Sequence, residues 1–263
     1  MTRSDVRSSW HITLSVWHAL LLREAVSRMF SRRSALLWLL LEPVVHILVL
    51  ALIFSAIRVR HIGGMDTGLW IAAGMLAFFL FQRTAFRGAA ALDANQALFT
   101  YRQVKPADTV LMRCVLEAVI MGLVITLTLL GLGVAGTPLT AYGPLLILAA
   151  LAGLWLLAVG CAQTFAAAKA LVPEVGHAIG LATIGLAFLS GVIFPLSAIP
   201  TPWREWLMLN PVAHGVEAVR AGISAYYHHV PELDLAYLYL AAAVMLALGL
   251  AMQHRFRHKV VSL

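Results

Sequence analysis

Long apolar stretches separated by short polar connections dominate the chain. Each stretch holds about 20 mainly apolar residues, the length that a helix needs to cross the ~30 Å hydrocarbon core of a bilayer. Six such stretches occur, at residues 34–57, 68–87, 109–132, 144–167, 177–198 and 235–254. The pattern predicts an all-α integral membrane protein in which six transmembrane helices form a single domain over residues 1–263, with five of them in 34–198 and the sixth in 235–263.

Residues 1–33, ahead of the first stretch, follow a different pattern. Apolar side chains recur there at helical spacing, at Trp10, Leu14, Trp17, Leu21 and Ala25. With the basic residues that accompany them, they favour an amphipathic helix lying in the membrane interface. Packing of this helix on a soluble partner is the alternative. Because arginines interrupt the apolar pattern, we do not expect a cleavable signal peptide.

The connection at residues 199–234 contains a segment, LNPVAHGVEAVRAGI (209–223), that is too short and too polar to span. Asn210 suits the helix cap and Pro211 the first helical position. A helix from Pro211 to Tyr226 would be about 24 Å long, less than the hydrocarbon thickness. We therefore expect a re-entrant helical hairpin between the fifth and sixth helices.

Two stripes divide that segment on a helical wheel. The apolar stripe holds four residues, and the polar stripe holds His214, Glu217 and Arg220. Together with Asn210 and Pro211, these three polar residues are candidates for a gate at the outer end of a transport path. Glu217 and Arg220 are three residues apart and can pair, so a purely structural ion pair is the alternative.

Composition supports the membrane assignment. Hydrophobic residues make up 61% of the chain and charged residues 12%, against roughly 45–50% and 25% in soluble domains. The net charge is +7, but the basic residues flank apolar stretches instead of forming a stripe, so nucleic acid is not an expected partner. Cys114 and Cys161 fall inside apolar stretches, which argues against a disulfide framework or a metal cluster.

The Lys and Arg residues are distributed unequally between the two predicted sides of the membrane. One side, which includes both termini, carries 15 of them and the opposite side carries 4. By the positive-inside rule both termini are expected to be cytoplasmic, and the 209–223 segment is expected on the outer side.

Ionisable residues inside the predicted spans are candidates for a polar path. Glu42 and His46 lie four apart on one helical face beside Pro43, and Arg83 and Arg87 lie one turn apart in the second span. A buried carboxylate costs about 2.5–3.5 kcal/mol on insertion scales, so Glu42 should face protein or water. The alternatives are an interhelical hydrogen bond for Glu42 and snorkelling toward the interface, the interpretation we favour, for the two arginines.

Catalytic motifs are not evident. Glu42 with His46 does not form the HExxH motif of zinc proteases, and Glu174 with His177 has no accompanying nucleophile. The phosphate-binding motif GxxxxGK[ST] does not occur, so any ATP-driven activity requires a separate ATPase. We expect no catalytic residue, metal or cofactor in this chain. Small residues indicate close helix packing, at Gly131, Gly133, Gly136, Gly176 and Gly180.

After the second span comes a polar connection with aromatic anchors, within LDANQALFTYRQVKPADTVLMRCVLE (92–117). A short helix in this connection would suit docking to a partner, because aromatic residues and Arg contribute strongly at interfaces. The candidate contact residues are Asp93, Asn95, Leu98, Phe99, Tyr101 and Arg102. Another interfacial helix is the alternative.

The order of these features resembles the membrane subunit of ABC-2 type exporters, and within them the capsular polysaccharide export permeases. Four blocks carry the resemblance: LLEPVVHILVLALIF (40–54), ANQALFTYRQVKPADTVLMRCVLE (94–117), LSGVIFPLSAIP (189–200) and LNPVAHGVEAVRAG (209–222). The second and fourth are the more specific, and the resemblance covers nearly the whole chain.

The resemblance implies a homodimer in the bacterial inner membrane, bound to two copies of an ABC ATPase that carries the ATP and Mg²⁺. The substrate would be a lipid-linked acidic polysaccharide, the 93–105 region would be the coupling helix, and a periplasmic adaptor and an outer-membrane channel would be further partners. Permeases for O-antigen-like or teichoic-acid-like polymers, or for small drugs, are alternatives within the class. A membrane scaffold or an intramembrane enzyme is the alternative outside it.

Overall fold

The computed structural model describes residues 9–30, 35–56, 61–101, 103–137, 141–257 and 259. Helices dominate this part of the chain, and one short hairpin accompanies them. In order, the elements are α1 (Ser9–Phe30), α2 (Ala35–Ala56), β1 (His61–Ile62), β2 (Met65–Asp66), α3 (Thr67–Ala89), α4 (Ala91–Asn95), the 3₁₀ helix η1 (Gln96–Thr100), α5 (Pro106–Val134), α6 (Pro144–Leu171), α7 (Val175–Leu189), the 3₁₀ helix η2 (Leu196–Ala198), α8 (Trp203–Leu207), α9 (Pro211–Ile223) and α10 (Leu235–Arg255). The predicted helical class is confirmed.

Four of the described helices, α3, α5, α6 and α10, are long and apolar enough to cross a bilayer. Two further apolar stretches are shorter, Leu41–Phe54 within α2 and Val175–Leu189 in α7. The fifth predicted span was expected to reach residue 198, but α7 has 15 residues, a rise of only about 22 Å. It stops because Gly191 turns the chain with a φ of +66° and Pro195 follows, which cannot continue a helix.

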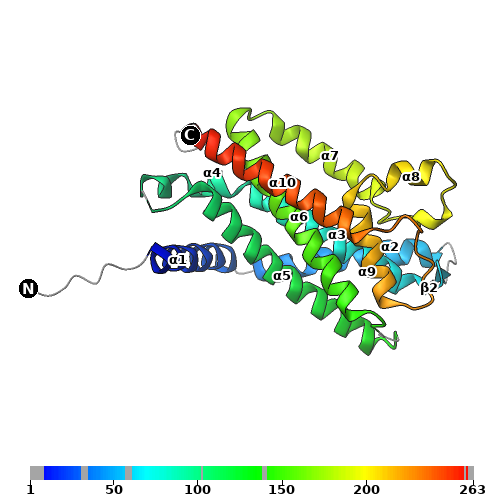
Figure 1. Cartoon of the computed structure of the whole chain (residues 1–263). Coiled ribbons are helices and arrows are strands. Elements are labelled where there is room, and N and C mark those ends of the chain that lie inside the picture. The colour runs from blue at the N-terminus through cyan, green and yellow to red at the C-terminus, as the bar shows by residue number, and fades with distance from the viewer. Residues whose placement is uncertain are drawn as a thin grey trace, which may run out of the picture.

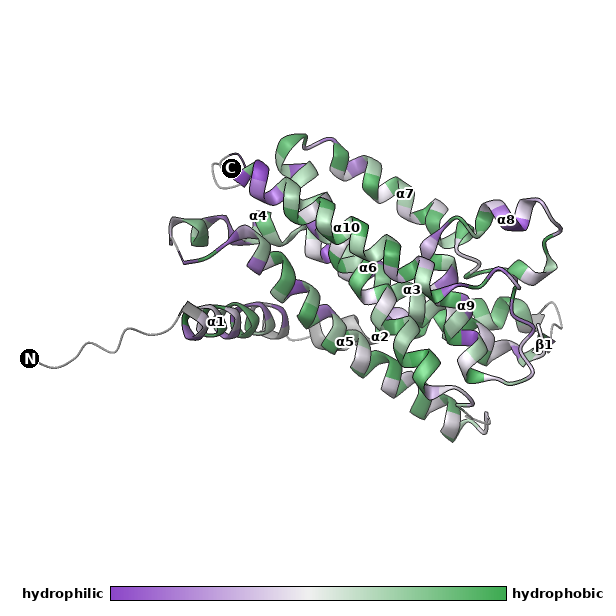
Figure 2. Ribbon diagram, viewed as in Figure 1, coloured by the Kyte–Doolittle hydropathy of each residue, from purple (hydrophilic) through white to green (hydrophobic). Residues whose placement is uncertain are grey.

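The helices run between two ends of the molecule (Figure 1). Helices α1 and α4 and the last turn of α10 lie at one end, called here the α4 end. Helices α8 and α9 and the hairpin lie at the other, called the α9 end. Hydrophilic residues gather at both ends, whereas the long helices are mainly hydrophobic between them (Figure 2). This division matches an apolar belt with two polar faces.

Helix α1 forms where the sequence predicted an amphipathic helix. It packs on α5, and its Leu20 is buried, while Trp10, Leu14 and Val26 remain exposed. Uncovered apolar side chains on a helix that also carries basic groups are available to a membrane interface.

Helix α9 begins at the residues predicted from the sequence, Asn210 and Pro211. The Asn210 side chain accepts a hydrogen bond from the Val212 backbone N–H at 3.0 Å, and Pro211 is the first helical residue. The helix ends at Ile223, three residues before the predicted end at Tyr226, with Ser224 at its C-cap. Its 13 residues rise about 20 Å, too little to span a bilayer.

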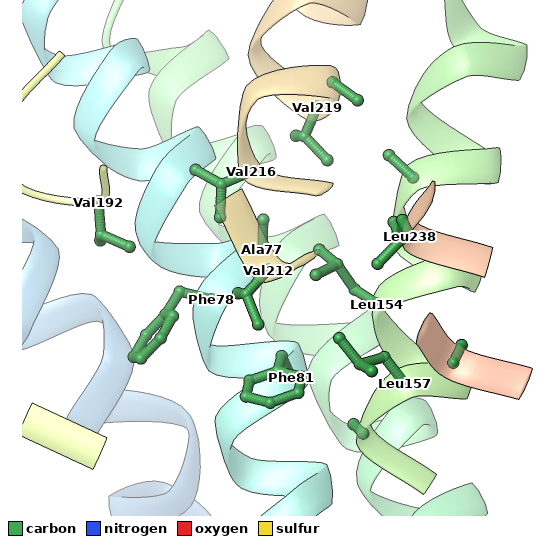
Figure 3. Packing of buried hydrophobic residues seen from close by; sticks show 14 of the residues in the cluster. Ala77, Phe78, Phe81, Leu154, Leu157, Val192, Val212, Val216, Val219 and Leu238 are labelled. Carbon is green, nitrogen blue, oxygen red and sulfur yellow. The ribbon is translucent and has the colours of Figure 1, made fainter. Parts of the chain in front are cut away.

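The main apolar core lies at the α9 end and joins α3, α6, α9 and α10. Val212, Val216 and Val219 of the predicted apolar stripe point into it from α9 (Figure 3). Phe78 of α3 and Leu154 of α6 face them. The polar stripe of α9 is also buried, so this helix is enclosed on nearly all sides.

Close packing of α6 on α10 depends on glycines other than those predicted. A Cβ on Gly160 would lie 2.6 Å from the Leu246 backbone nitrogen, and one on Gly249 would lie 2.8 Å from the Thr164 nitrogen. Nothing lies within 4 Å of a Cβ added to Gly131 or Gly180, and Gly136 is equally open. Within the described chain, those predicted packing glycines therefore make no close helix contact.

Replacing Gly160 with alanine is expected to destabilise the protein by about 1–3 kcal/mol, because the added methyl meets backbone atoms that cannot rotate away. The matched control is Gly122→Ala in α5, where nothing lies within 4 Å and alanine is the better helix former. Thermal unfolding of the detergent-solubilised protein, followed by tryptophan fluorescence, compares the two. Equal transition temperatures for both variants would contradict the close α6–α10 contact.

Candidate functional site

The predicted pair of Glu217 and Arg220 is formed at the α9 end. Arg220 Nη1 lies 3.1 Å from Glu217 Oε1, and neither side chain is exposed. Arg220 also donates to the backbone carbonyls of Gly191 at 2.7 Å and Val192 at 3.1 Å. Because burying a charge is costly unless its hydrogen bonds are satisfied, these carbonyls are essential to the pair.

Helix α3 supplies the rest of the environment of Arg220. The guanidinium carbon lies 3.6 Å from the centre of the Trp70 ring, in a cation–π contact. A Cβ on Gly74 would lie 2.1 Å from Arg220 Nη2, so only glycine leaves room for the guanidinium at this position of α3. The pair therefore connects α9, α3 and the turn after α7.

Tyr227, in the connection after α9, completes this network. Its hydroxyl donates to Glu217 at 2.9 Å, while burial, followed by the adjacent carboxylate, raises the pKa of the phenol and keeps it a donor. Sequence analysis missed Trp70, Gly74 and Tyr227 because each is ordinary in its local context. No spacing rule relates them to Arg220.

The other two outer candidates are also held by hydrogen bonds. His214 accepts from the Asp234 backbone N–H through Nδ1 at 2.9 Å, which leaves Nε2 to donate to the Met208 carbonyl at 2.7 Å. Asn210 caps α9 and donates to Ser190 Oγ at 2.8 Å. Both residues fix the N-terminal part of α9 to neighbouring segments.

A surface ion pair holds α8 nearby. Arg204 donates to both carboxylate oxygens of Glu232, at 2.8 Å from Nη2 and 3.1 Å from Nε. These hydrogen bonds hold the pKa of the Glu232 carboxyl below its usual range. The pair links α8 to the connection before α10.

Toward the α4 end, three of the predicted path residues come together. Glu42 Oε2 lies 2.8 Å from Arg83 Nη2 and 3.7 Å from Arg87 Nη2. Arg83 is 6% exposed, so the snorkelling favoured from the sequence is wrong for it: the carboxylate of α2 holds it inside. His46 lies one turn further along α2, where its Nδ1 is 2.7 Å from the Glu42 carbonyl oxygen.

Two further carboxylates, which sequence analysis missed, extend this group. Glu117 of α5 is fully buried and pairs with Arg28 of α1, with Arg87 3.9 Å away. Glu24 of α1 is 5% exposed and pairs with Arg113 at 2.6 Å. The rule applied to Glu42, that an acid inside an apolar helix needs a partner, would have identified Glu117 as well.

Among the described residues, this charge cluster carries more positive than negative groups. These are three carboxylates and four guanidinium groups, from Glu24, Glu42, Glu117, Arg28, Arg83, Arg87 and Arg113. The side chains of Glu42 and Arg87 are 36% and 33% exposed. The cluster is thus accessible between α2 and α3, and its surplus charge attracts anions.

The predicted coupling residues divide into an inner and an outer set. Asn95 is 2% exposed and Phe99 8% exposed, the latter within an apolar cluster on α5 and α6. Tyr101 is 65% exposed, and Asp93 is exposed and pairs with Lys169 of α6 at 2.9 Å. Leu98 is intermediate. Arg102 lies outside the described residues.

Beside this segment, α3, α6 and α7 border a cavity of about 320 Å³. Phe86, Lys169 and His177 are among the lining residues. In the described part of the chain, no group of three or more His, Cys, Asp or Glu side chains is placed to hold a metal ion.

Comparison with known proteins gives consistent matches over most of the chain. The family model described as ABC-2 type transporter matches residues 16–224. The polysialic acid transport protein KpsM of Escherichia coli is 32% identical over 247 residues, covering 94% of this chain and 95% of that protein. Two capsule polysaccharide export inner-membrane proteins are also similar. CtrC of Neisseria meningitidis serogroup B is 26% identical, and the match covers 90% of this chain and 89% of that protein. BexB of Haemophilus influenzae is 25% identical, and the match covers 97% of this chain and 96% of that protein.

Replacing Arg220 with alanine is expected to destabilise the protein by about 3–5 kcal/mol, because it leaves the Glu217 carboxylate buried without its partner. Arg204→Ala, which removes a surface pair, should cost only about 0–1 kcal/mol. Gly74→Ala should reproduce part of the Arg220→Ala loss, and the double variant should lose less than the sum of the two. Unfolding temperatures of the four variants test this, and additive losses would show that Gly74 and Arg220 act independently.

Proposed function

Because the chain belongs to the ABC-2 type transporter family, we propose that it is the membrane permease of an ATP-driven exporter of capsular polysaccharide. The observation that carries this function is the similarity to named capsule and polysialic acid export proteins over nearly the full length of both chains. Four helices of spanning length fit a permease. ATP and Mg²⁺ would bind a separate ATPase subunit, and this chain would have no catalytic residue of its own.

In the proposed topology, α2, α3, α5, α6, α7 and α10 provide six membrane segments, and the α4 end faces the cytoplasm. The excess of Lys and Arg on the side of both termini supports this orientation in the bacterial inner membrane. Helix α2 has 22 residues, enough to cross the bilayer, whereas α7 has 15 and would cross only part of it. Several apolar side chains of α7 are exposed and suit a homodimer, among them Leu181, Ile184 and Phe188.

The exposed face of α4 and η1 is the proposed contact for the ATPase, with one ATPase copy for each permease. Tyr101 is the strongest candidate, because a large exposed aromatic side chain is typical of an interface anchor. Phe99 and Asn95 face inward, so they would shape this element instead of touching the partner.

The charge cluster is the proposed start of the path for a lipid-linked acidic polysaccharide. Its surplus guanidinium charge suits an anionic headgroup, and Glu42 and Arg87 are partly accessible. Five buried polar atoms of α1, α3 and α5 have no hydrogen-bond partner within the described chain: Trp17 Nε1, Trp70 Nε1, Thr84 Oγ1, Arg113 Nε and Glu117 Oε2. Two of them, Arg113 Nε and Glu117 Oε2, belong to the charge cluster. Since buried polar atoms are normally paired with protein, water or ligand, these two add polar capacity to this path.

At the opposite end, α8 and α9 would border the exit of the path. The exposed rings of Trp203 and Trp206 suit the outer interface of the membrane. A periplasmic adaptor and an outer-membrane channel would receive the polymer there. The network around Arg220 would fix the shape of this exit.

Deleting the gene is expected to remove the polysaccharide from the cell surface and to leave long glycolipid inside the cell, because synthesis continues without export. Extraction and size separation of surface and intracellular glycolipid measure this. Complementation with the unaltered gene should restore both fractions. Unchanged surface polysaccharide in the deletion strain would rule out the proposed function.

Replacing Tyr101 with alanine should weaken binding of the ATPase and lower export several-fold while the protein remains inserted, as expected for loss of an interface anchor. The matched control is Tyr226→Ala, since Tyr226 is 75% exposed at the opposite end. Phe99→Ala should instead lower the unfolding temperature, because it opens a cavity in the core. Co-purification of the ATPase with each variant separates these effects; equal recovery with Tyr101→Ala and the control would exclude the docking role.

A further inference from the structure

Asn95 occupies an unusual position at the end of α4. Its side chain is 2% exposed, and both ends of the amide are used. The oxygen accepts from Arg23 Nη1 at 2.7 Å, and the nitrogen donates to Glu24 Oε1 at 2.9 Å and to the Ala91 carbonyl at 2.8 Å. One side chain of α4 is thereby bonded to two consecutive residues of α1.

Only an amide satisfies both partners at once. Arg23 is a donor, and Glu24, which also accepts from Arg113 of α5, is an acceptor. An aspartate at position 95 would keep the bond to Arg23 but place a second carboxylate against Glu24. Because Glu24 and Asn95 are buried, a missing donor leaves an unsatisfied acceptor, which costs more than the bond itself contributes.

The polar link of α4 to α6 is more exposed. It is the ion pair between Asp93 and Lys169, whose side chains are 57% and 27% exposed, and exposed pairs contribute little to stability and are screened by salt. Ala91 and Leu92 of α4 also pack in a buried apolar cluster with side chains of α5 and α6. Helix α4 is thus joined to α1 by buried hydrogen bonds and to α5 and α6 by apolar packing.

We propose that Asn95 is a positioning residue that makes α1 and α4 move as one unit during transport. This inference rests on the proposed function, in which the ATPase contacts the exposed face of α4 and η1. A displacement of α4 passes through Asn95 and Glu24 to α1 and, through Arg113, to α5.

Moving the negative charge from position 24 to position 95 tests the hydrogen bonds between Asn95 and α1. In the complex with its ATPase in lipid vesicles, Asn95→Asp should lower export about tenfold, the loss expected from one charge-assisted hydrogen bond. ATP hydrolysis should stay within about twofold of the unaltered complex, since the exposed ATPase contact is retained. Adding Glu24→Gln should restore part of the export, because glutamine supplies a donor to the new carboxylate and the total charge returns to its original value, while the Ala91 carbonyl remains without its donor. Normal export by Asn95→Asp, or no recovery in the double variant, would overturn the proposal.

Cross-linking provides a second test, in which the same protein is compared with the cross-link formed and with the cross-link reduced. In a Glu24→Cys and Asn95→Cys variant, a short reducible thiol cross-linker should restore export, and reduction should abolish it again. The native Cys114 and Cys161 are buried, which limits competing reaction. Export that stays low after the cross-link between positions 24 and 95 has formed would overturn the proposal.

Failure of this inference is distinguishable from failure of the proposed function. If gene deletion removes surface polysaccharide but Asn95→Asp exports normally, the permease function stands and the coupling through Asn95 is wrong. If deletion has no effect on surface polysaccharide, the function is wrong. Hydrogen exchange of α1 in the full chain still tests the bond: faster exchange is expected in Asn95→Asp, and unchanged exchange would refute it.

Discussion

The guanidinium of Arg220 holds together segments that are far apart in the sequence. A charge inside an apolar bundle is stable only if other groups replace the water it has lost. Here the replacements are the Glu217 carboxylate, two carbonyls of the turn after α7 and the face of Trp70. The position of α9 therefore depends on the turn after α7 and on α3, and none of the three can shift without leaving this charge unsatisfied.

The two ends of the molecule use buried charge in opposite ways. Around Arg220 the two charges are balanced and enclosed, and both make hydrogen bonds, which favours one fixed arrangement. Among the described residues of the charge cluster, guanidinium groups outnumber carboxylates, Glu42 and Arg87 are partly accessible, and Arg113 and Glu117 retain unpaired polar atoms. An enclosed α9 end and a polar, accessible α4 end suit the proposed permease, which would recruit an anionic substrate from one side.

The predictions from the sequence are confirmed where a feature depends only on residues close together in the chain. The cap of α9 at Asn210 and Pro211, the helical class and the need of Glu42 for a partner all follow from residues within one or two turns. A prediction was wrong where a residue far away in the sequence determines the position of a side chain. Arg83 was expected to snorkel because its neighbours are apolar, yet Glu42 of another helix holds it inside.

The sequence by itself determined a helical membrane protein of the ABC-2 type, because apolar length and family motifs are properties of consecutive residues. Only the tertiary structure decided that Asn95 and Phe99 face inward while Tyr101 faces outward, because burial depends on what the neighbouring helices cover. It likewise decided that Gly160 and Gly249 mediate packing while Gly180 does not. The physical reason is the same in each case: a side chain's role is set by its partners in space, and these come from helices far away along the chain.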